Sequence, residues 1–517
     1  MKVRRVAEKN ILLLVVFLTG AASLVIEVAA FRILSPHFGN TIYTTSSVIG
    51  IVLGALSFGY YVGGLVSDRH PTERWFFGLI LIGGGSVFLL EFFALFILPV
   101  LSQVFSIVTG PLISSLVLFF IPSFFLGTLS PFAIKLQHLS LPQEGVGRIA
   151  GEVYFWSTLG SIAGSLLAGF VFIPNFGVQE IIIGTAVSLV VLGSLGYVKA
   201  GAPKSTIFII VSIFIVSAAV VFSAASPLNV PGLVYSKEGI YEKITIYDGN
   251  YKGYPARFLI LDRSASGAMF LDSDELVYDY SKYYSVYKLF KPDIKNALVI
   301  GGGAYSLPKA ILKDSPEVEV DVAEIEPSLF ELGKKFFKIP DNPQLKNYVE
   351  DGRMFLRQNS KKYDLIFSDV YFSFYSIPAH FTTREFFELA RERLADDGVF
   401  IANLAGSLSR ETPSFILSEI RTFQSVFPSS YFFAAESPKF SSLQNIILVG
   451  SKGEKKIDFS NPKVKNSPDE ILRGLSEKLV NTNQFELSLY KELTDNFTPV
   501  EYLAAKMLSR FYGTDSY

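Results

Sequence analysis

Long uncharged stretches fill the first 225 or so residues of the chain. A helix needs about 20 mostly apolar residues to cross the hydrocarbon layer of a membrane, and seven stretches reach or approach that length. They cover residues 11–30, 48–66, 75–101, 111–133, 153–173, 181–198 and 207–225. The fourth stretch carries Pro111, Pro122 and Pro131, and prolines inside a helix can break it. The pattern predicts a transmembrane bundle of about seven helices over residues 1–227.

Three pairs of glycines with a spacing of four residues lie in these stretches. The pairs are Gly50 with Gly54, Gly59 with Gly63, and Gly160 with Gly164. Small residues at this spacing let two helix backbones approach closely. We therefore expect the glycine pairs to mark close packing within the bundle.

Lysine and arginine gather in alternate loops between the apolar stretches. The basic segments are residues 1–5, 67–74, 135–148 and 199–204, whereas segments 35–41, 102–110 and 174–179 contain neither residue type. Positively charged loops mark the cytoplasmic side of a membrane protein. Seven spans that start from a cytoplasmic N-terminus place the rest of the chain outside the cytoplasm.

The second half of the chain has a different pattern, with short alternating strands from Gly232 onward. Residues 241–247 and 257–261 read as two strands, and residues 248–250 read as the turn between them. A helix is expected over residues 274–290. Residues 228–292 are thus predicted to form a small β domain followed by a helix.

Strands and helices then alternate in four consecutive pairs. The predicted strand–helix pairs are 296–300 with 306–313, 318–325 with 328–337, 363–369 with 383–394, and 399–403 with 414–427, and the final strands are 431–435 and 445–449. Such alternation is typical of a doubly wound, mostly parallel sheet. The fold class is therefore a multi-pass α-helical membrane domain followed by an α/β Rossmann-like (S-adenosylmethionine methyltransferase-like) domain over residues 293–455, with a small N-terminal β unit before it. Residues 456–517 are predicted to be a helical tail.

Composition adds several exclusions. Apolar residues make up 50% of the chain and charged residues only 18%, as in a membrane protein. The net charge of -1 gives no reason to expect a nucleic-acid partner. The chain has no cysteine, which excludes disulfides, thiolate nucleophiles and cysteine-rich zinc sites. Its four histidines have no ligand spacing, so no metal is expected.

A glycine-rich turn follows the first strand of the predicted sheet. Gly301, Gly302 and Gly303 lie between this strand and the next helix, where the backbone can approach a ligand and the helix N-terminus favours an anionic or polar group. Glu324 and Glu326 end the next strand about 20 residues further on, where a carboxylate can accept both ribose hydroxyls. Asp351 and Gly352 follow the third element, as an acidic loop that contacts adenine would. These three positions at the carboxyl ends of successive strands indicate a nucleoside cofactor.

The sequence from about Glu238 to Val449 resembles the polyamine aminopropyltransferase (spermidine synthase) family, in particular its membrane-fused members. The resemblance is carried by Glu238-Gly-Ile-Tyr-Glu-Lys-Ile, Leu259-Ile-Leu-Asp, Asp274-Glu-Leu-Val-Tyr-Asp-Tyr, Val299-Ile-Gly-Gly-Gly, Glu324-Ile-Glu, Glu350-Asp-Gly, Phe367-Ser-Asp and Phe381-Thr. It implies that decarboxylated S-adenosylmethionine is the co-substrate. Its implied binding residues are Gly301, Gly302, Gly303, Glu324, Asp351 and Gly352.

The implied reaction is transfer of an aminopropyl group to an amine. A neutral amine attacks the methylene group beside the sulfonium and expels methylthioadenosine. Asp369 ends its strand, where its carboxylate can hold the amine cation and take its proton as general base. The alternative is that Asp369 is an ordinary loop acid or a helix cap.

Several positions depart from the family pattern on the amine side of the site. Ala304 stands where the family has an acid, Phe372 replaces a second acid, and Glu242 and Asp279-Tyr280 replace its glutamine and His-Glu pair. We expect Glu242, Tyr278, Asp279 and Phe372 to contact the amine substrate, but a diamine with two charges needs several carboxylates. The aromatic residues Tyr371, Phe372, Phe374 and Tyr375 could hold a cation, receive a more apolar acceptor, or rest on the membrane domain as a hydrophobic patch.

Two other functions stay open. One is methyl transfer from S-adenosylmethionine itself, and the other is a polyamine transporter or sensor whose second domain binds a nucleoside without catalysis. The expected partners are a small amine or polyamine, the lipid bilayer and a second copy of the chain in a homodimer. The protein is expected in the cell membrane; the charge rule places its second domain outside, whereas an adenosyl co-substrate favours the cytoplasm.

Overall fold

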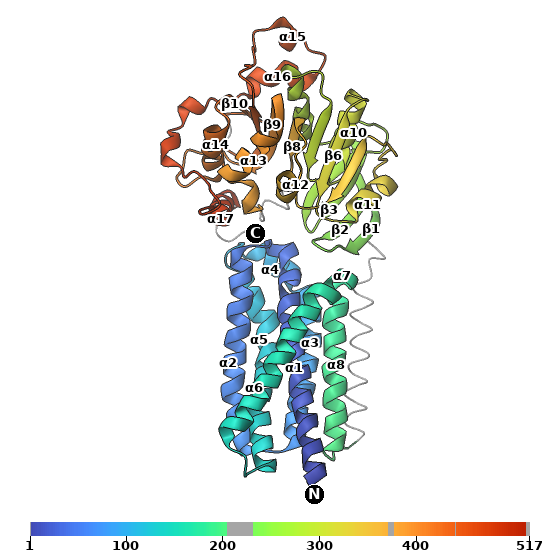
Figure 1. Ribbon diagram of the computed structural model, residues 1–517, viewed down its shortest axis with the longest axis vertical. Helices are drawn as coiled ribbons and strands as arrows, with labels where there is room; N and C mark the ends of the chain where they lie inside the picture. Colours follow the sequence, from blue (N-terminus) through green and yellow to red (C-terminus); the bar gives the residue numbers. More distant parts are fainter. Residues whose placement is uncertain (1, 204–230, 371–376, 440, 513–517) are drawn as a thin grey trace. The chain divides into compact units, whose positions relative to one another are not determined.

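The computed structural model describes residues 2–203, 231–370, 377–439 and 441–512. The chain divides into two compact units, one drawn from residues up to Asn229 and the other from Val230 onward (Figure 1). Each unit is described by itself below.

The first unit is a bundle of helices. Its elements are α1 (Lys2–Phe38), α2 (Ile42–Arg69), α3 (Glu73–Phe96), α4 (Leu98–Val104), α5 (Gly110–Ser140), α6 (Val146–Leu167), the π-helical turn η1 (Ala168–Phe172), α7 (Ile173–Asn175) and α8 (Val178–Lys199). Within the described residues, six helical segments are long and apolar enough to cross a membrane. The seventh predicted stretch, residues 207–225, lies outside the described residues.

Two of the predicted spans differ in detail from the structure. The stretch 75–101 is divided between α3 and α4, and Pro99 lies at the start of α4, where a missing backbone N–H costs nothing. The stretch 111–133 forms one unbroken helix, α5, with Pro122 and Pro131 inside it. Prolines are tolerated inside apolar helices of a bundle because neighbouring groups satisfy the freed backbone carbonyls.

Two of the three glycine pairs pack closely in the bundle. A Cβ atom on Gly63 would lie 2.4 Å from the backbone oxygen of Thr128 in α5, and one on Gly164 would lie 2.2 Å from that of Ala21 in α1. Gly59 and Gly160 make equally close approaches to the same two helices. Nothing lies within 4 Å of a Cβ atom placed on Gly50 or Gly54. The first pair therefore faces away from its described neighbours, against expectation.

The second unit begins with a four-stranded antiparallel sheet in the order β1-β2-β3-β4. Its strands are β1 (Leu233–Glu238), β2 (Lys243–Tyr251), β3 (Tyr254–Leu261) and β4 (Ser264–Phe270). The turn predicted at 248–250 is wrong, because these residues lie inside β2. Asp248 is opposite Arg257 and accepts two hydrogen bonds from its guanidinium, at 2.7 and 2.8 Å. The hairpin turns at Lys252 and Gly253, which both have a positive φ, as a two-residue turn of this type requires.

The helix predicted over 274–290 is shorter in the structure. A 3-10 helix, η2 (Asp279–Leu289), begins five residues later, and the backbone at Tyr278 is extended. Asp274, at the start of the predicted helix, instead forms an ion pair with Lys309 at 3.0 Å. The buried face of η2 carries Tyr283 and Tyr287, which explains its helical pattern.

A seven-stranded sheet follows, in the order β10-β11-β9-β8-β5-β6-β7. Its strands are β5 (Asn296–Ile300), β6 (Glu319–Glu324), β7 (Leu345–Val349), β8 (Tyr363–Ser368), β9 (Leu394–Gly406), β10 (Ser430–Ala434) and β11 (Gln444–Ser451). Strands β5 to β9 pair in parallel, and β11 pairs antiparallel with both β9 and β10. This arrangement confirms the predicted fold class; β7 was not predicted.

Helices cover both faces of this sheet (Figure 1). They are α10 (Ser306–Asp314), α11 (Leu329–Phe336), α12 (Gly352–Gln358), η3 (Ala379–Phe381), α13 (Arg384–Arg393), α14 (Phe415–Val426), α15 (Pro462–Lys465), α16 (Glu470–Lys478), η4 (Thr482–Gln484), η5 (Leu487–Leu489) and α17 (Val500–Tyr512). Alternate residues of β5 enter opposite cores: Val299 packs with η2, α10 and α11, whereas Leu298 packs with α12, α13 and α14.

The chain order reverses between β5 and β8, which lie side by side although five elements separate them in sequence. In open parallel sheets, ligands bind in the crevice outside the carboxyl ends of the strands at such a point. A ligand site is therefore expected at the residues that follow Ile300 and Ser368.

The glycine packing yields a test of the bundle. Gly63→Leu should lower the apparent melting temperature of the full chain in detergent, because its side chain meets the backbone of α5. Overpacking of this kind costs about 1–3 kcal/mol. Gly54→Leu, in the same helix but with open space at its Cβ, is the control and should leave the melting temperature unchanged. Equal effects of the two substitutions would contradict the observed packing of α2 on α5.

Candidate active site

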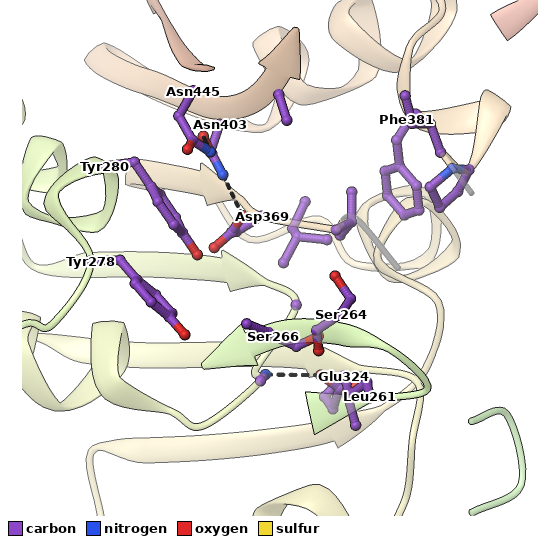
Figure 2. A pocket seen from close by; sticks show the side chains of 18 of the residues that line it. Leu261, Ser264, Ser266, Tyr278, Tyr280, Glu324, Asp369, Phe381, Asn403 and Asn445 are labelled. Carbon is purple, nitrogen blue, oxygen red and sulfur yellow. Dashed lines mark hydrogen bonds between the residues drawn. The ribbon is translucent and has the colours of Figure 1, made fainter. Parts of the chain in front are cut away.

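A cavity of about 630 Å³ opens at the carboxyl ends of the strands in the second unit. The small β sheet forms one wall and the seven-stranded sheet forms the other (Figure 2). Of the predicted site residues, Gly301, Gly303, Glu324, Asp351, Gly352, Asp369, Glu242, Tyr278 and Asp279 line this cavity. Gly302, in the same turn, lines a smaller neighbouring cavity, and Phe372 is outside the described residues. One cavity thus brings together predicted site residues that are up to 127 positions apart in sequence, from Glu242 to Asp369.

The glycine turn is tightly packed on both sides. Gly301 has a φ of 89°, and a Cβ atom there would lie 2.3 Å from the backbone oxygen of Asp369. Gly303 has a φ of 50°, and its Cβ atom would lie 2.6 Å from the backbone oxygen of Ser266 in β4. Glycine is required at both positions, because a side chain would push the turn away from β4 or from the end of β8.

Glu324 lies beneath this turn and holds it. Its Oε2 atom accepts hydrogen bonds from the backbone N–H groups of Gly302, at 2.7 Å, and Gly303, at 3.3 Å. Its Oε1 atom accepts one from the N–H of Glu326 at 2.9 Å. Burial raises the pKa of Glu324 and outweighs these bonds, which act to lower it. Both lone pairs of Oε2 are thus occupied, whereas Oε1 still has one that can accept a hydroxyl proton from a ligand.

Asp351 caps helix α12 and also reaches the cavity. Its Oδ1 atom accepts hydrogen bonds from the N–H groups of Arg353 and Met354, both at 3.0 Å. Its Oδ2 atom lies 3.0 Å from Nε2 of His380. Burial opposes ionisation of this carboxyl group, but the contacts with His380 and the helix N–H groups prevail and lower its pKa.

Asp369 is held by a chain of polar side chains that continues across the sheet. The side-chain amide of Asn445 donates to Asn403 at 2.9 Å, and that of Asn403 donates to Oδ1 of Asp369 at 2.9 Å (Figure 2). The hydroxyl of Tyr280 lies beside Asp369 (Figure 2). Burial raises the pKa of the Asp369 carboxyl group, and Asn403 and Tyr280 oppose that change only in part. The carboxyl group is therefore easier to protonate than an aspartate in water.

The wall beside Asp369 combines two tyrosines with a paired acid. The rings of Tyr278 and Tyr280 stack with centroids 5.8 Å apart. Asp279 forms ion pairs with Lys252 at 2.9 Å and with Lys282 at 3.0 Å. These lysines lower the pKa of Asp279 against the opposing effect of burial. Asp279 lines the cavity, but two cations already neutralise its charge.

Several cavity residues were not found from the sequence. Asn403 could have been noticed, because β9 pairs in parallel with β8 and its Ala402 lies opposite Ser368, next to Asp369. No sequence signal identifies His380, which is 29 residues from Asp351. Lys252 was missed because the hairpin turn was predicted four residues too early. In the described parts of the chain, no cluster of three or more acidic or histidine side chains is arranged to hold a metal ion.

Comparison with known proteins agrees with this geometry. The sequence profile of the spermine/spermidine synthase domain matches residues 272–461. The C-terminal domain fits the spermine/spermidine synthase family. The resemblance stated from the sequence motifs is therefore confirmed for this domain.

Individual relatives match parts of this spermidine synthase-like domain. A polyamine aminopropyltransferase from Vibrio vulnificus is 30% identical over 148 residues, which are 28% of this chain and 48% of the relative. An N-terminal histidine N-methyltransferase from Emericella nidulans is 31% identical over 175 residues, 32% of this chain and 30% of that enzyme. The chain thus spans half or less of the length of these two relatives. A probable spermidine synthase from Corynebacterium glutamicum of known structure is 22% identical with a TM-score of 0.43, over 52% of this chain and 98% of that one.

The buried Glu324 carboxylate leads to a prediction about stability and binding together. Because burial raises its pKa, the stabilising contribution of Glu324 is greatest at low pH and is lost as the pH rises through its folded pKa. Glu324→Gln removes the charge but also replaces one accepting oxygen by an NH2 group that faces a backbone N–H, so the melting temperature at neutral pH should fall. The loss should grow on acidification, because the wild type becomes more stable as its carboxyl group is protonated and the variant does not. Methylthioadenosine binding, measured by calorimetry, should weaken by about tenfold or more, since a charged hydrogen-bond acceptor is lost.

Glu319→Gln is the matched control, at the other end of the same strand β6. It should leave methylthioadenosine binding unchanged. If Glu324→Gln lowers the melting temperature and leaves binding intact, the carboxylate has only a structural role.

Proposed function

We propose that the second unit transfers an aminopropyl group from decarboxylated S-adenosylmethionine to an amine, and that the first unit anchors this enzyme in a membrane. One observation carries the proposal. A single cavity joins the glycine turn and Glu324, which suit a nucleoside, to Asp369, which suits an amine. The division of the second unit into a small β domain, a Rossmann-like domain and a helical tail, made from the sequence, is part of the same proposal.

The groups around the cavity fit the co-substrate. Oε1 of Glu324 has a free lone pair for a ribose hydroxyl, and the glycine turn above it places no side chain in the way. Asp351 presents its carboxylate beside His380 at the edge of the cavity and is positioned to meet an exocyclic amino group. The cavity lining holds the carboxylates of Glu242, Glu436 and Asp369 as well, which favours cations such as a sulfonium and an amine.

The role we assign to Asp369 follows from its environment. The acceptor amine must lose its proton before its lone pair can attack the methylene carbon next to sulfur. As the new C–N bond forms, the C–S bond breaks and its electron pair stays on sulfur, so that methylthioadenosine leaves as a neutral molecule. The proton of the amine passes to the Asp369 carboxylate. Its raised pKa makes it a stronger base than an exposed aspartate, and Asn403 and Tyr280 fix its orientation.

The acceptor we infer is a small amine or polyamine. The ion pairs of Asp279 with Lys252 and Lys282 remove one carboxylate that a diamine would use at its far end. Glu242 and Glu436 are further acidic residues of the cavity lining. We propose contacts of Glu242, Tyr278 and Asp279 with the acceptor. The same proposal gives Phe372, which lies outside the described residues, a place in the acceptor site.

The proposed base gives a direct test. Asp369→Asn in the full chain should reduce the turnover number by about 100-fold or more, because general base catalysis contributes that much. The assay measures methylthioadenosine release from decarboxylated S-adenosylmethionine across a panel of monoamines and diamines. Binding of methylthioadenosine should be unchanged, since Asp369 faces the amine. The wild-type rate should fall at acidic pH as Asp369 becomes protonated, beginning at a higher pH than for an ordinary aspartate.

Asp341→Asn replaces an exposed acid outside the cavity and serves as the control for this assay. Retained turnover in Asp369→Asn would exclude Asp369 as the base. Product formation from S-adenosylmethionine with transfer of a methyl group would instead establish the methyltransferase alternative. Absence of turnover with every amine would leave the transporter or sensor alternative.

Membrane anchoring is proposed from the six long apolar helices of the first unit, and the reaction needs a cytoplasmic supply of the co-substrate. We therefore expect a green fluorescent protein fused to the C-terminus to fluoresce and alkaline phosphatase at the same place to be inactive. Fusions in the basic loop between α5 and α6 and after α7 calibrate the two sides of the membrane. An active C-terminal phosphatase would agree with the charge rule and contradict cytoplasmic catalysis.

A further inference from the structure

A segment of the C-terminal tail is bound to the edge of the cavity through one arginine. The guanidinium of Arg353, in α12, donates to both carboxylate oxygens of Asp495, at 2.8 and 2.6 Å. Arg353 directly follows Gly352 and is only 9% exposed. These two residues are 142 positions apart, so the pair fixes the tail against the start of α12.

The same arginine also holds the residue that contacts Asp351. Its Nη1 atom donates to the backbone oxygen of His380 at 3.0 Å. The ring of His380 in turn lies 3.0 Å from Oδ2 of Asp351. Asp495 is therefore connected to the cavity wall by a continuous path of three contacts, through Arg353 and His380 to Asp351.

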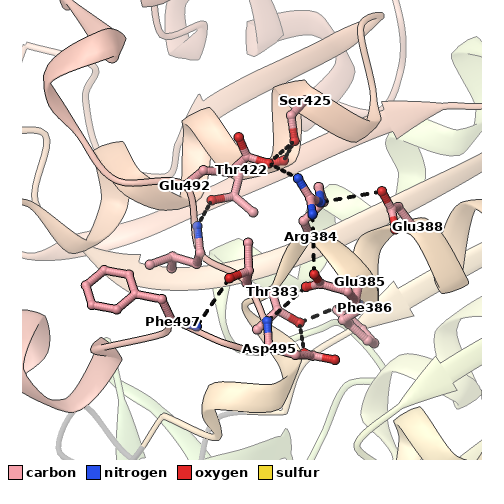
Figure 3. A network of polar contacts seen from close by, with 12 residues as sticks. Thr383, Arg384, Glu385, Phe386, Glu388, Thr422, Ser425, Glu492, Asp495 and Phe497 are labelled. Carbon is pink, nitrogen blue, oxygen red and sulfur yellow. Dashed lines mark hydrogen bonds and ion pairs between the residues drawn. The ribbon is translucent and has the colours of Figure 1, made fainter.

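Asp495 is itself fixed from helix α13 (Figure 3). Its Oδ1 atom accepts a hydrogen bond from the hydroxyl of Thr383 at 2.8 Å, and its backbone N–H donates to Glu385 at 3.0 Å. The bonds from Arg353 are the main cause of the lowered pKa of Asp495, which stays ionised near neutral pH. A two-bond contact between guanidinium and carboxylate sets both distance and orientation.

Removal of this carboxylate leaves a nearly buried cation with less compensation. The Nε atom of Arg353 has no hydrogen-bond partner among the described residues, and the Asp495 carboxylate is its ion-pair partner there. An unpaired buried charge moves toward water, because its desolvation is costly. Movement of Arg353 would release the backbone of His380 and with it the contact to Asp351.

We propose that Asp495 is a positioning residue for the nucleoside subsite, acting through Arg353 and His380 on Asp351. The tail segment around Asp495 is then part of the binding site, although it is outside the cavity lining. This inference rests on the proposed nucleoside site.

The test uses the full chain in detergent with methylthioadenosine as the probe. Asp495→Asn keeps the size of the side chain and removes its charge. We expect the dissociation constant, measured by calorimetry, to increase by about tenfold. Hydrogen exchange of the unliganded protein should become faster at residues 377–383 and 351–354 and stay unchanged elsewhere in the second unit.

A pH series separates positioning from general loss of structure. His380 helps to keep the pKa of Asp351 low, so loss of their contact raises that pKa toward its ordinary value. As the pH is lowered, methylthioadenosine binding should therefore begin to weaken at a higher pH in Asp495→Asn than in the wild type. Asp495→Glu restores the charge and should recover most of the affinity.

Glu492→Gln is the matched control from the same tail segment. Glu492 pairs with Arg384 in α13 at 3.1 Å and accepts from Ser425 in α14 (Figure 3). Neither contact involves Arg353 or His380. It should leave nucleoside binding and its pH dependence unchanged. Normal binding by Asp495→Asn, or equal effects of the two substitutions, overturns the inference alone. Failure of the wild type to bind any adenosyl nucleoside overturns the proposed function and this inference with it.

Discussion

The contact between the ends of β5 and β8 determines the rest of the site. The N–H of Asp369 donates to the carbonyl oxygen of Ile300 at 2.9 Å, so the glycine turn and the proposed base leave neighbouring strands at the same level. Gly301 must be glycine, because a Cβ atom would collide with the backbone of Asp369. Backbone geometry therefore keeps the proposed nucleoside side and the proposed amine side of the cavity adjacent. Glu324, one strand away, holds the same turn from below.

The cavity places several carboxyl groups close together and keeps each in a different electrostatic state. Glu324 and Asp369 have raised pKa values because burial disfavours their charge. Asp351 and Asp279 have lowered values because His380 in one case and two lysines in the other compensate for burial. Groups whose surroundings separate their pKa values in this way can take different roles in one reaction. A cationic co-substrate would relieve the burial cost of the first pair, so ligand binding and the ionisation of these groups are coupled.

The sequence was sufficient for the fold class, and it also located the residues at the strand ends. Apolar length and strand–helix alternation depend on local composition, and the carboxyl-end rule predicts that Gly301, Glu324 and Asp369 lie at one edge of the sheet. Contacts made by distant segments could not be predicted in this way. The ion pair of Asp248 with Arg257 converts a predicted turn into the middle of a strand. The links from Asp351 to His380 and from Arg353 to Asp495 join segments with no shared motif, and only the three-dimensional structure reveals them.

Asp369 can now be compared with an acid that is plainly a helix cap. Asp351 accepts two backbone N–H groups at the start of α12, and its pKa is lowered, as expected for a carboxylate at a helix N-terminus. The carboxylate of Asp369 instead accepts from the side chain of Asn403, and its pKa is raised. A capping carboxylate stabilises the fold while it is ionised, whereas a carboxylate with a raised pKa destabilises the fold while it is charged. Destabilisation of this kind is typical of catalytic residues, and it disappears when the carboxylate takes up a proton during turnover. The environment of Asp369 thus favours the base over the ordinary loop acid.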